Sequence, residues 1–351
     1  MPSSGKLILG IVGCGRVFER YHLPALSTSN DWKLSALCEP LKERREWISR
    51  FYSRVPVFES YHEFLKYPSI EAVLIATPPA THYSLSVKAL NAGLHVMVEK
   101  PFALNVEDAK KLLEASQRNQ RKLKIGFNRR FNSHYLELKN KLSIIPSDRI
   151  KSISSKLIIN PDNWNAVTSF YGKDSEGGGV IDDVASHQID LVPWLLGDKV
   201  ESVRANIAAS DGKAGSEHIK FELKFNKGLI AKCEAGHGAK YAENIEIQLE
   251  NRKFLASPTG LLELHRMPTG LAHFYSRLRT FLHFSTHRFS GKPNVTLKSI
   301  AKQLISFAAA IRGEKGTLTG ADAQSGFDSL QIIQACRRSI QSSGSWTTTF
   351  S

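Results

Sequence analysis

Long hydrophobic runs, internal repeats and low-complexity tracts are missing from this sequence. No stretch approaches the roughly 18 to 20 apolar residues that are needed to cross a bilayer, and the first residues lead into a strand-like segment without the pattern of a signal peptide. Of the 351 residues, 42% are hydrophobic and 23% are charged, which is typical of a globular protein large enough for two domains. We therefore expect a cytoplasmic protein with no membrane-spanning segment.

Cysteine is also scarce. The four cysteines, Cys14, Cys38, Cys233 and Cys336, are far apart in the chain and show no C-x-x-C spacing and no matching pattern of histidines. This spacing argues against a structural zinc site and against a disulfide framework. We predict four reduced cysteines that pack in the interior, and no metal site.

Acidic residues are outnumbered, since 33 Asp and Glu stand against 47 Lys and Arg and leave a net charge of +14. A surplus of this size raises the local concentration of anions of any kind. It therefore bears on the partners of the protein and not on its fold.

The first third of the chain alternates short aliphatic runs with helical stretches. The strand-like runs are residues 7–12, 34–39, 72–77, 95–99 and 123–127, and the helical stretches are residues 60–66, 81–92 and 106–120. Strands that alternate with helices predict a parallel, doubly wound sheet. The nearly continuous apolar run at residues 72–77 predicts a strand that is buried on both faces.

After about residue 145 the pattern changes to longer alternating runs that are separated by turn residues, which predicts an antiparallel meander. Helices are expected at residues 185–196, 297–312 and 321–342. The expected fold class is α/β plus α+β: a parallel Rossmann sheet in residues 1–126, followed by a domain on a large, mainly antiparallel open sheet in residues 127–351.

A glycine-containing turn follows the first strand directly. Two glycines allow the chain to turn tightly and let backbone N–H groups approach a pyrophosphate at a helix N-terminus. Phe18 occupies the place of the third glycine of the usual fingerprint, so the helix and the strand cannot pack as closely there. The residues predicted to bind the pyrophosphate are Gly13, Gly15, Arg16, Val17 and Phe18. The alternative is that this segment is only a turn.

Glu39 ends the second predicted strand, 26 residues after Gly13. A carboxylate at this position accepts hydrogen bonds from the hydroxyls of an adenosine ribose, and it repels a 2′-phosphate. The sequence therefore favours NAD over NADP as the cofactor. In the alternative interpretation, Glu39 merely ends a strand before Pro40.

Three further motifs occur in a fixed order along the chain. They are ATPPATH at residues 76–82, EKP at residues 99–101, and GGG at residues 177–179 followed by DxxxHxxD at residues 183–190. Together with the glycine-containing turn, they resemble the Gfo/Idh/MocA family of sugar and cyclitol dehydrogenases. The matching motifs span residues 7–197, and the predicted meander and C-terminal helices are compatible with the rest of that family's fold.

The resemblance implies roles for residues at the ends of the fourth and fifth strands, where a parallel sheet forms its cofactor crevice. It implies that Thr77, Pro78, His82 and Glu99 line the cofactor, and that Lys100 hydrogen-bonds the reacting hydroxyl group. Two alternatives stay open from the residues alone. His82 is then a capping or core histidine of the following helix, and Lys100 is a solvated strand end.

The third motif places Asp183 and His187 four residues apart, so a helix would bring their side chains to one face. The resemblance implies that His187 is the general base that accepts the alcohol proton and that Asp183 positions the substrate. Asp190 is expected to be a supporting carboxylate. One arginine of the segment GFNRRF is expected to touch the substrate, and we assign this role to Arg130.

These inferences predict an NAD-dependent dehydrogenase that converts a secondary hydroxyl of a sugar, sugar derivative or cyclitol to a ketone, or the reverse. The alternative from another class is a catalytically silent NAD-binding regulator of the same fold. The joint presence of Lys100, Asp183 and His187 argues against a regulator, which needs none of them. Reduction of a double bond or dehalogenation stays open. We expect a homo-oligomer.

One long segment, residues 264–313, contains no Asp or Glu but has eight Lys or Arg and four His. Its cations and aromatics fit an anionic-substrate lobe, a nucleic-acid surface or a membrane-surface segment, and a solvated or oligomer-facing loop is the simplest alternative. Among the specific interpretations we prefer an anionic substrate such as a phosphorylated or nucleotide-linked sugar. No nucleic-acid-binding module is recognisable.

Overall fold

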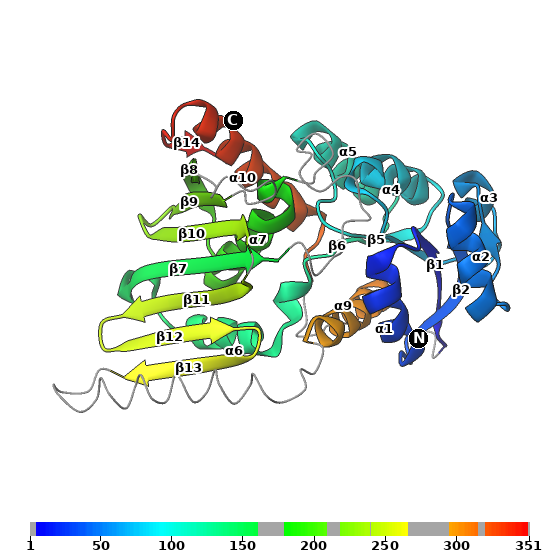
Figure 1. Cartoon of the computed structure of the whole chain (residues 1–351), viewed down its shortest axis with the longest axis horizontal. Coiled ribbons are helices and arrows are strands. Elements are labelled where there is room, and N and C mark those ends of the chain that lie inside the picture. Colours follow the sequence, from blue (N-terminus) through cyan, green and yellow to red (C-terminus); the bar gives the residue numbers. More distant parts are fainter. Residues whose placement is uncertain are drawn as a thin grey trace. The chain divides into compact units, whose positions relative to one another are not determined.

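The computed structural model describes residues 5–160, 179–208, 218–238, 240–265, 295–314 and 320–349 (Figure 1). These residues form two compact units. The first unit contains the described residues up to 131 together with 296–330, and the second contains those from 132 to 295 and from 331 onward. The division differs from the single boundary after residue 126 that the sequence suggested, because residues 296–330 pack with the first unit.

The sheet of the first unit has six strands in the order β3-β2-β1-β4-β5-β6, and every neighbouring pair is parallel. Its strands are β1 (Leu7–Val12), β2 (Trp32–Cys38), β3 (Val57–Phe58), β4 (Ala72–Ile75), β5 (His95–Val98) and β6 (Leu123–Ile125). This order confirms the predicted doubly wound sheet. All four residues of β4 are at most 1% exposed, which confirms a strand that is buried on both faces.

Helices cover both faces of this sheet (Figure 1). They are α1 (Leu23–Ser27), α2 (Lys42–Phe51), α3 (Tyr61–Leu65), α4 (His82–Asn91), α5 (Val106–Arg118) and α9 (Val295–Arg312). Helix α9 joins the core beside α1 and α2 through Ile300, Leu304 and Phe307. The indole of Trp32 stacks on Phe307 at 5.3 Å and donates a hydrogen bond of 2.9 Å to the Leu304 carbonyl. These contacts explain why α9 packs with the first unit although it lies late in the sequence.

The sheet of the second unit has eight strands in the order β13-β12-β11-β7-β10-β9-β8-β14. Its strands are β7 (Ile150–Ile159), β8 (Val200–Ala208), β9 (His218–Phe225), β10 (Ile230–His237), β11 (Ala242–Leu249), β12 (Arg252–Ser257), β13 (Gly260–His265) and β14 (Thr347–Thr348). The sheet is mainly antiparallel, as expected. The expectation of a simple meander was wrong, however, because β7 lies between β10 and β11 and pairs in parallel with β10.

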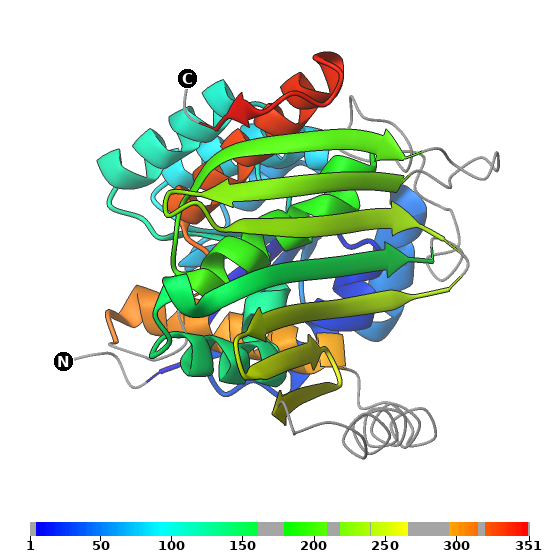
Figure 2. The same ribbon diagram turned by 90° about the vertical axis from the view of Figure 1, so that its left-hand side faces the viewer.

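One face of this second sheet is packed against helices, and none of the described helices of the unit lies on the other, open face. Behind the sheet in Figure 2 lie α6 (Ser133–Leu142), α7 (Ser186–Leu196) and α10 (Ala323–Gln341). The π-helical turn η7 (Ile181–Ala185) leads into α7, and short 3₁₀ turns, η2 (Pro79–Thr81), η3 (Asn128–Phe131) and η4 (Ser147–Arg149), connect other elements. In the part of the chain that the structure describes, no helix is long and apolar enough to cross a membrane.

Candidate functional site

The glycine-containing turn closely follows β1 and depends on Gly13. Its backbone has φ +86°, and a Cβ atom there would lie 2.7 Å from the Ala76 carbonyl oxygen. Only glycine adopts this conformation at so close an approach without strain. At Gly15, by contrast, an added Cβ atom would meet no described atom within 4 Å. The turn therefore leaves open space at the position where a pyrophosphate would approach the backbone.

The helix after this turn begins as a π-helical segment, η1 (Phe18–His22), and continues as α1. Phe18 is fully buried in the core of the first unit. The space that a third glycine would leave is thus filled by an aromatic ring. The Phe18 side chain is therefore not accessible to a ligand at this turn.

Glu39 follows β2 and is 5% exposed. Its carboxylate accepts a hydrogen bond of 2.8 Å from the Cys14 backbone N–H at Oε2, and one of 3.0 Å from the Leu41 N–H at Oε1. These bonds fix the carboxylate beside the glycine-containing turn. Because each carboxylate oxygen has two lone pairs, each can still accept one further hydrogen bond, so the geometry fits a pair of ribose hydroxyls.

Arg44, which the sequence analysis did not single out, also lies at this turn. Its guanidinium donates to the Cys14 carbonyl, with Nε at 3.2 Å, and pairs with Glu19 at 3.2 Å. A fixed cation therefore stands close to the proposed pyrophosphate position. Arg44 lies on the α2 helix, 30 residues from Cys14 in sequence, so no local motif could have indicated this contact.

His82 begins α4 and is 1% exposed. Its Nε2 lies 2.8 Å from the Thr77 carbonyl and its Nδ1 lies 2.7 Å from the Pro101 carbonyl. Burial lowers the pKa of His82, although the two carbonyls favour its charged form. Each ring nitrogen thus faces a backbone carbonyl, which fits the interpretation of His82 as a core histidine, and the predicted contact with the cofactor stays a prediction. In this role it ties the end of β4 to the EKP segment.

Glu99 directly precedes Lys100 after β5. Its Oε1 lies 2.8 Å from Nε2 of His22, which is fully buried, and a Cβ atom on Gly126 would lie 2.5 Å from its Oε2. Burial alone would raise the pKa of Glu99, but the hydrogen bond and charge of His22, together with Lys100 and His82, hold the pKa below its usual range. The carboxylate is therefore fixed against η1. Lys100, the next residue, is partly buried and is joined to Pro101 by a cis peptide bond.

Arg130 lies in η3, at the end of the first unit, and is 8% exposed. Its Nη1 lies 3.5 Å from the Ser325 hydroxyl at the start of α10. The side chain thus contacts residues that are distant in sequence but belong to the same unit. Its predicted contact with a substrate stays a prediction.

In the second unit, Asp183 lies in η7 and His187 lies in the first turn of α7. His187 is 8% exposed and Asp190 is 3% exposed. The Asp183 carboxylate lies 3.4 Å from Nε2 of His237, at the end of β10. Two predicted site residues are therefore carried by one continuous π-to-α helical segment. Gly177 and Gly178 of the third motif lie outside the described residues.

The neighbouring Asp182 is fully buried and forms an ion pair with Arg337 of α10. This pair anchors η7 from the side of α10. Neither Asp182 nor His237 was singled out from the sequence, because their partners lie 155 and 54 residues away.

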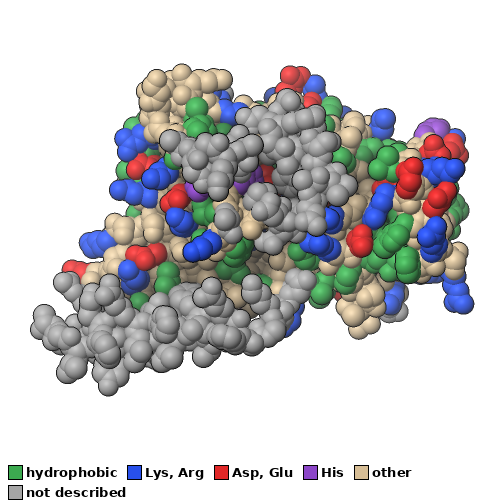
Figure 3. Space-filling model, viewed as in Figure 1, with side chains coloured by type: hydrophobic (Ala, Val, Ile, Leu, Met, Phe, Trp, Pro, Cys, Tyr) green, Lys and Arg blue, Asp and Glu red, His purple; other side chains and the backbone are tan. Residues whose placement is uncertain are grey.

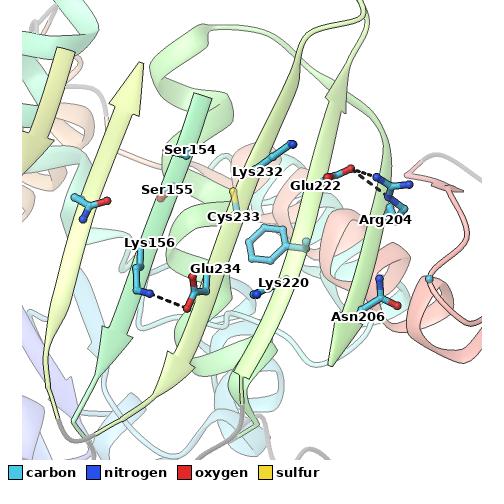
Figure 4. A pocket seen from close by; sticks show the side chains of 13 residues that line it. Ser154, Ser155, Lys156, Arg204, Asn206, Lys220, Glu222, Lys232, Cys233 and Glu234 are labelled. Carbon is cyan, nitrogen blue, oxygen red and sulfur yellow. Dashed lines mark hydrogen bonds and ion pairs between the residues drawn. The ribbon is translucent and has the colours of Figure 1, made fainter. Parts of the chain in front are cut away.

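A groove of about 580 Å³ lies on the open face of the second sheet (Figure 4). Its charged side chains are Lys156, Arg204, Lys220, Glu222, Lys232 and Glu234. Cross-strand ion pairs join Lys156 to Glu234 at 2.8 Å, and Arg204 to Glu222. None of the predicted site residues is among the described residues that line this groove, so we do not assign the predicted chemistry to it.

On the face drawn in Figure 3, Lys and Arg side chains are interspersed with Asp and Glu. Most of the acid-free segment, residues 266–294, lies outside the described residues.

All four cysteines are buried and reduced, as predicted. Within the described ranges, no group of three or more His, Cys, Asp or Glu is arranged to hold a metal ion.

Comparison with curated proteins gives relatives at modest identity. Inositol 2-dehydrogenase from Salmonella typhimurium is 29% identical over 197 residues, 56% of each chain. Myo-inositol 2-dehydrogenase from Thermotoga maritima is 25% identical over 252 residues, 70% of this chain and 73% of the relative. D-glucoside 3-dehydrogenase from Escherichia coli is 26% identical over 207 residues, 58% of each chain. The aligned part of the chain spans 56 to 61% of the length of several curated relatives.

Two solved structures share the fold over nearly the whole chain. The WlbA dehydrogenase from Bordetella pertussis, in complex with NADH and UDP-GlcNAcA, has a TM-score of 0.80 at 22% identity and covers 98% of both chains. The scyllo-inositol dehydrogenase from Lactobacillus casei, with bound NAD(H) and scyllo-inositol, has a TM-score of 0.78 at 19% identity and covers 99% of this chain and 100% of the other. At these identities the likeness shows the fold alone.

Two family models match the chain. One, an oxidoreductase family with an NAD-binding Rossmann fold, matches residues 7–127, and the other, the GFO/IDH/MocA C-terminal domain, matches residues 151–254. Both matches fall on the sheets described above, one on each. The chain belongs to the Gfo/Idh/MocA oxidoreductase family.

Proposed function

We propose that this protein is an NAD-dependent dehydrogenase that interconverts a secondary hydroxyl and a ketone on a sugar, a sugar derivative or a cyclitol. The observation that carries the proposal is the arrangement around Lys100. This lysine lies between two residues that are fixed by buried histidines: His22 contacts the Glu99 carboxylate before it, and His82 contacts the Pro101 carbonyl after it. Inositol and glucoside dehydrogenases among the relatives support the substrate class.

The first unit has the features that an NAD molecule needs. The space at Gly15, the carboxylate of Glu39 and the fixed Arg44 lie around one turn. We propose that Gly13, Gly15 and the residues after them bind the pyrophosphate, and that Glu39 binds the ribose hydroxyls. A carboxylate that is already held by two amides cannot turn away from a 2′-phosphate, which supports NAD over NADP. When bound, NAD supplies the hydride acceptor.

We propose chemical roles for Lys100, His187 and Asp183. The Lys100 ammonium donates a hydrogen bond to the oxygen of the reacting hydroxyl and stabilises the negative charge that develops as the proton leaves. A ring nitrogen of His187 accepts that proton, and the Asp183 carboxylate binds a neighbouring hydroxyl and orients the substrate. We propose that Thr77 and Pro78 line the cofactor and that Arg130 contacts the substrate.

A regulator that binds NAD without catalysis is the second candidate. It requires the glycine-containing turn and Glu39 but has no use for Lys100, Asp183 and His187. Buried contacts fix the Glu99 carboxylate beside Lys100 and lie against Asp183. These contacts favour the dehydrogenase. We propose that the protein works in the cytoplasm as a homo-oligomer and acts on small molecules and not on nucleic acid.

The deciding experiment is a panel of neutral sugars, cyclitols, sugar phosphates and nucleotide sugars, tested with NAD and with NADP by the absorbance of the reduced nicotinamide. We expect turnover of at least one polyol with NAD. Tight binding of NAD by calorimetry with no turnover of any member of the panel would favour the regulator instead.

We further propose that the substrate is anionic, because residues 264–313 combine eight cationic side chains with no carboxylate. Replacing Arg277 and Arg279 by glutamine should raise KM for a phosphorylated or nucleotide-linked substrate and leave KM for a neutral sugar unchanged. The effect should shrink as salt screens the field. Unchanged kinetics with loss of the oligomer in light scattering would place these residues at a subunit interface.

A further inference from the structure

We propose that His237 is a positioning residue that sets the direction of the Asp183 carboxylate. This inference rests on the proposed function, in which Asp183 binds the substrate. The Nε2 atom of His237 lies 3.4 Å from Oδ2 of Asp183, and the two side chains are 8% and 18% exposed. The contact joins the end of β10 to η7, two elements of the same unit.

His237 occupies an unusual place for a polar side chain. The inward-facing residues of β10 before it are Ala231, Cys233 and Ala235, all buried and apolar. The strand is still paired at His237, opposite Ile159 of β7, and the following Gly238 N–H donates to the Ile159 carbonyl. The imidazole is therefore held by a fixed backbone and turned inward, where a polar group requires a hydrogen-bonding partner.

The partner is one of two adjacent aspartates that are held from different sides. Asp182 pairs with Arg337 of α10 and anchors η7, while Asp183 lies against β10. The backbone of η7 is thus already fixed without His237. What the His237 contact adds is the orientation of the Asp183 carboxylate, because an N–H donor at Oδ2 restricts rotation about the bond to the carboxyl group and so sets the direction of Oδ1.

This role differs from that of a histidine that merely fills the core. Replacing a histidine that only fills the core would change kcat/KM equally whether or not residue 183 is an aspartate. Replacing a positioning histidine lowers kcat/KM only while the Asp183 carboxylate is present. Misplacement of a substrate-binding group by a fraction of an ångström lowers the rate without disturbing the fold. Glutamine, whose amide N–H is also a donor, should replace the imidazole in part.

The test measures kcat/KM, with NAD saturating, for a polyol that the parent protein oxidises. We expect His237→Ala to lower kcat/KM at least tenfold, and His237→Gln to remain within about threefold of the parent, with NAD affinity unchanged within twofold in both. The matched control is His218→Ala. This histidine lies on the neighbouring strand β9, contacts Glu234 at 4.0 Å on the open face, and should leave kcat/KM unchanged.

Two comparisons decide the result. In an Asp183→Asn background, His237→Ala should change kcat/KM by less than twofold, since the carboxylate that it orients is gone. A further tenfold loss in that background, or a His237→Ala variant with the parent's kcat/KM, would overturn the proposal.

A second readout does not depend on activity. The free energies of unfolding of Asp183→Asn, His237→Ala and the double variant should be non-additive if the two side chains interact, and additive values would also overturn the proposal. If the parent oxidises no polyol, the proposed function fails, and this cycle still decides whether the contact exists.

Discussion

The most informative residue to replace in the first unit is His22, whose buried ring holds Glu99 at 2.8 Å. A hydrogen bond to a charged group contributes about 1.5 to 3 kcal/mol to stability, and truncation of a buried ring leaves a cavity as well. We therefore expect His22→Ala to lower the free energy of unfolding by about 3 kcal/mol at pH 7. The loss should consist of one part that depends on pH and one that does not.

The pH-dependent part follows from Glu99. In the parent its folded-state pKa lies below the unfolded value, which is about 4.3, so its contribution to stability is present above that pH and is lost as the pH falls through the folded-state pKa. In His22→Ala, the hydrogen bond and charge that most lower the pKa of Glu99 are lost while burial still raises it, so we expect the folded-state pKa to exceed the unfolded value. The variant then loses stability as the pH rises from the unfolded-state pKa of Glu99, which is about 4.3, to its raised folded-state pKa. The destabilisation should therefore be greater at pH 7 than at pH 5.

The assay is urea unfolding at pH 5 and pH 7, followed by circular dichroism. The control is His62→Ala, because His62 is an exposed residue of α3 and its replacement should change stability by less than about 0.5 kcal/mol. An equal loss at both pH values would refute the reasoning, since a cavity alone does not depend on pH. The electrostatic role of the His22–Glu99 pair would then be wrong.

Three further predictions concern the proposed site. The parent should bind NAD at least tenfold more tightly than NADP, a difference of about 1.4 kcal/mol, and Glu39→Ser should narrow that gap in calorimetry; equal affinities in the parent would remove Glu39 from this role. Lys100→Met and His187→Ala should each lower kcat by roughly a hundredfold or more, with NAD affinity within a few fold for His187→Ala, and normal turnover in both would contradict the proton-transfer assignment. Gly13→Ala should destabilise the protein by more than about 1 kcal/mol in thermal or urea unfolding, because its backbone has φ +86° and its Cβ would meet the Ala76 carbonyl. Gly15→Ala is the matched control and should leave stability nearly unchanged, so equal stability of the two variants would contradict the argument.

Elements with a strong apolar signal could be predicted closely from the sequence. The predicted strand at residues 7–12 matches β1, and the helix expected at residues 297–312 is α9, which begins two residues earlier. Both have several side chains in one core. The helix α2 was missed because it buries only Ile48 of its ten residues, so its sequence, KERREWISRF, shows almost no apolar face.

The order of strands in the second sheet could not be predicted in the same way. Alternation identifies a strand and its buried face, but it does not identify the neighbour. β7 precedes β8 in sequence yet lies between β10 and β11, with a parallel partner on one side and an antiparallel partner on the other. Such pairings join residues that are 78 to 99 positions apart in the sequence, and they are selected by packing of the whole unit and not by any local turn.

The same limit applies to the candidate site. Strand ends indicated Glu39 and Lys100, because the position of a residue after a parallel strand is a local property. Their supporting contacts are not local: His22 lies 77 residues from Glu99, and His237 lies 54 residues from Asp183. Sequence reasoning therefore identifies the groups that can do chemistry sooner than the groups that orient them.

His82 shows how a structure changes the meaning of a motif residue. From the sequence, its position after a strand end in ATPPATH made a cofactor contact the favoured interpretation. A histidine has only two ring nitrogens, and both of these lie within 2.8 Å of backbone carbonyls, at Thr77 and Pro101. A side chain that is 1% exposed and has a carbonyl facing each nitrogen fits the alternative of a core histidine, and its contact with the cofactor stays a prediction. The two contacts place the His82 ring between the segments that follow β4 and β5, next to Lys100.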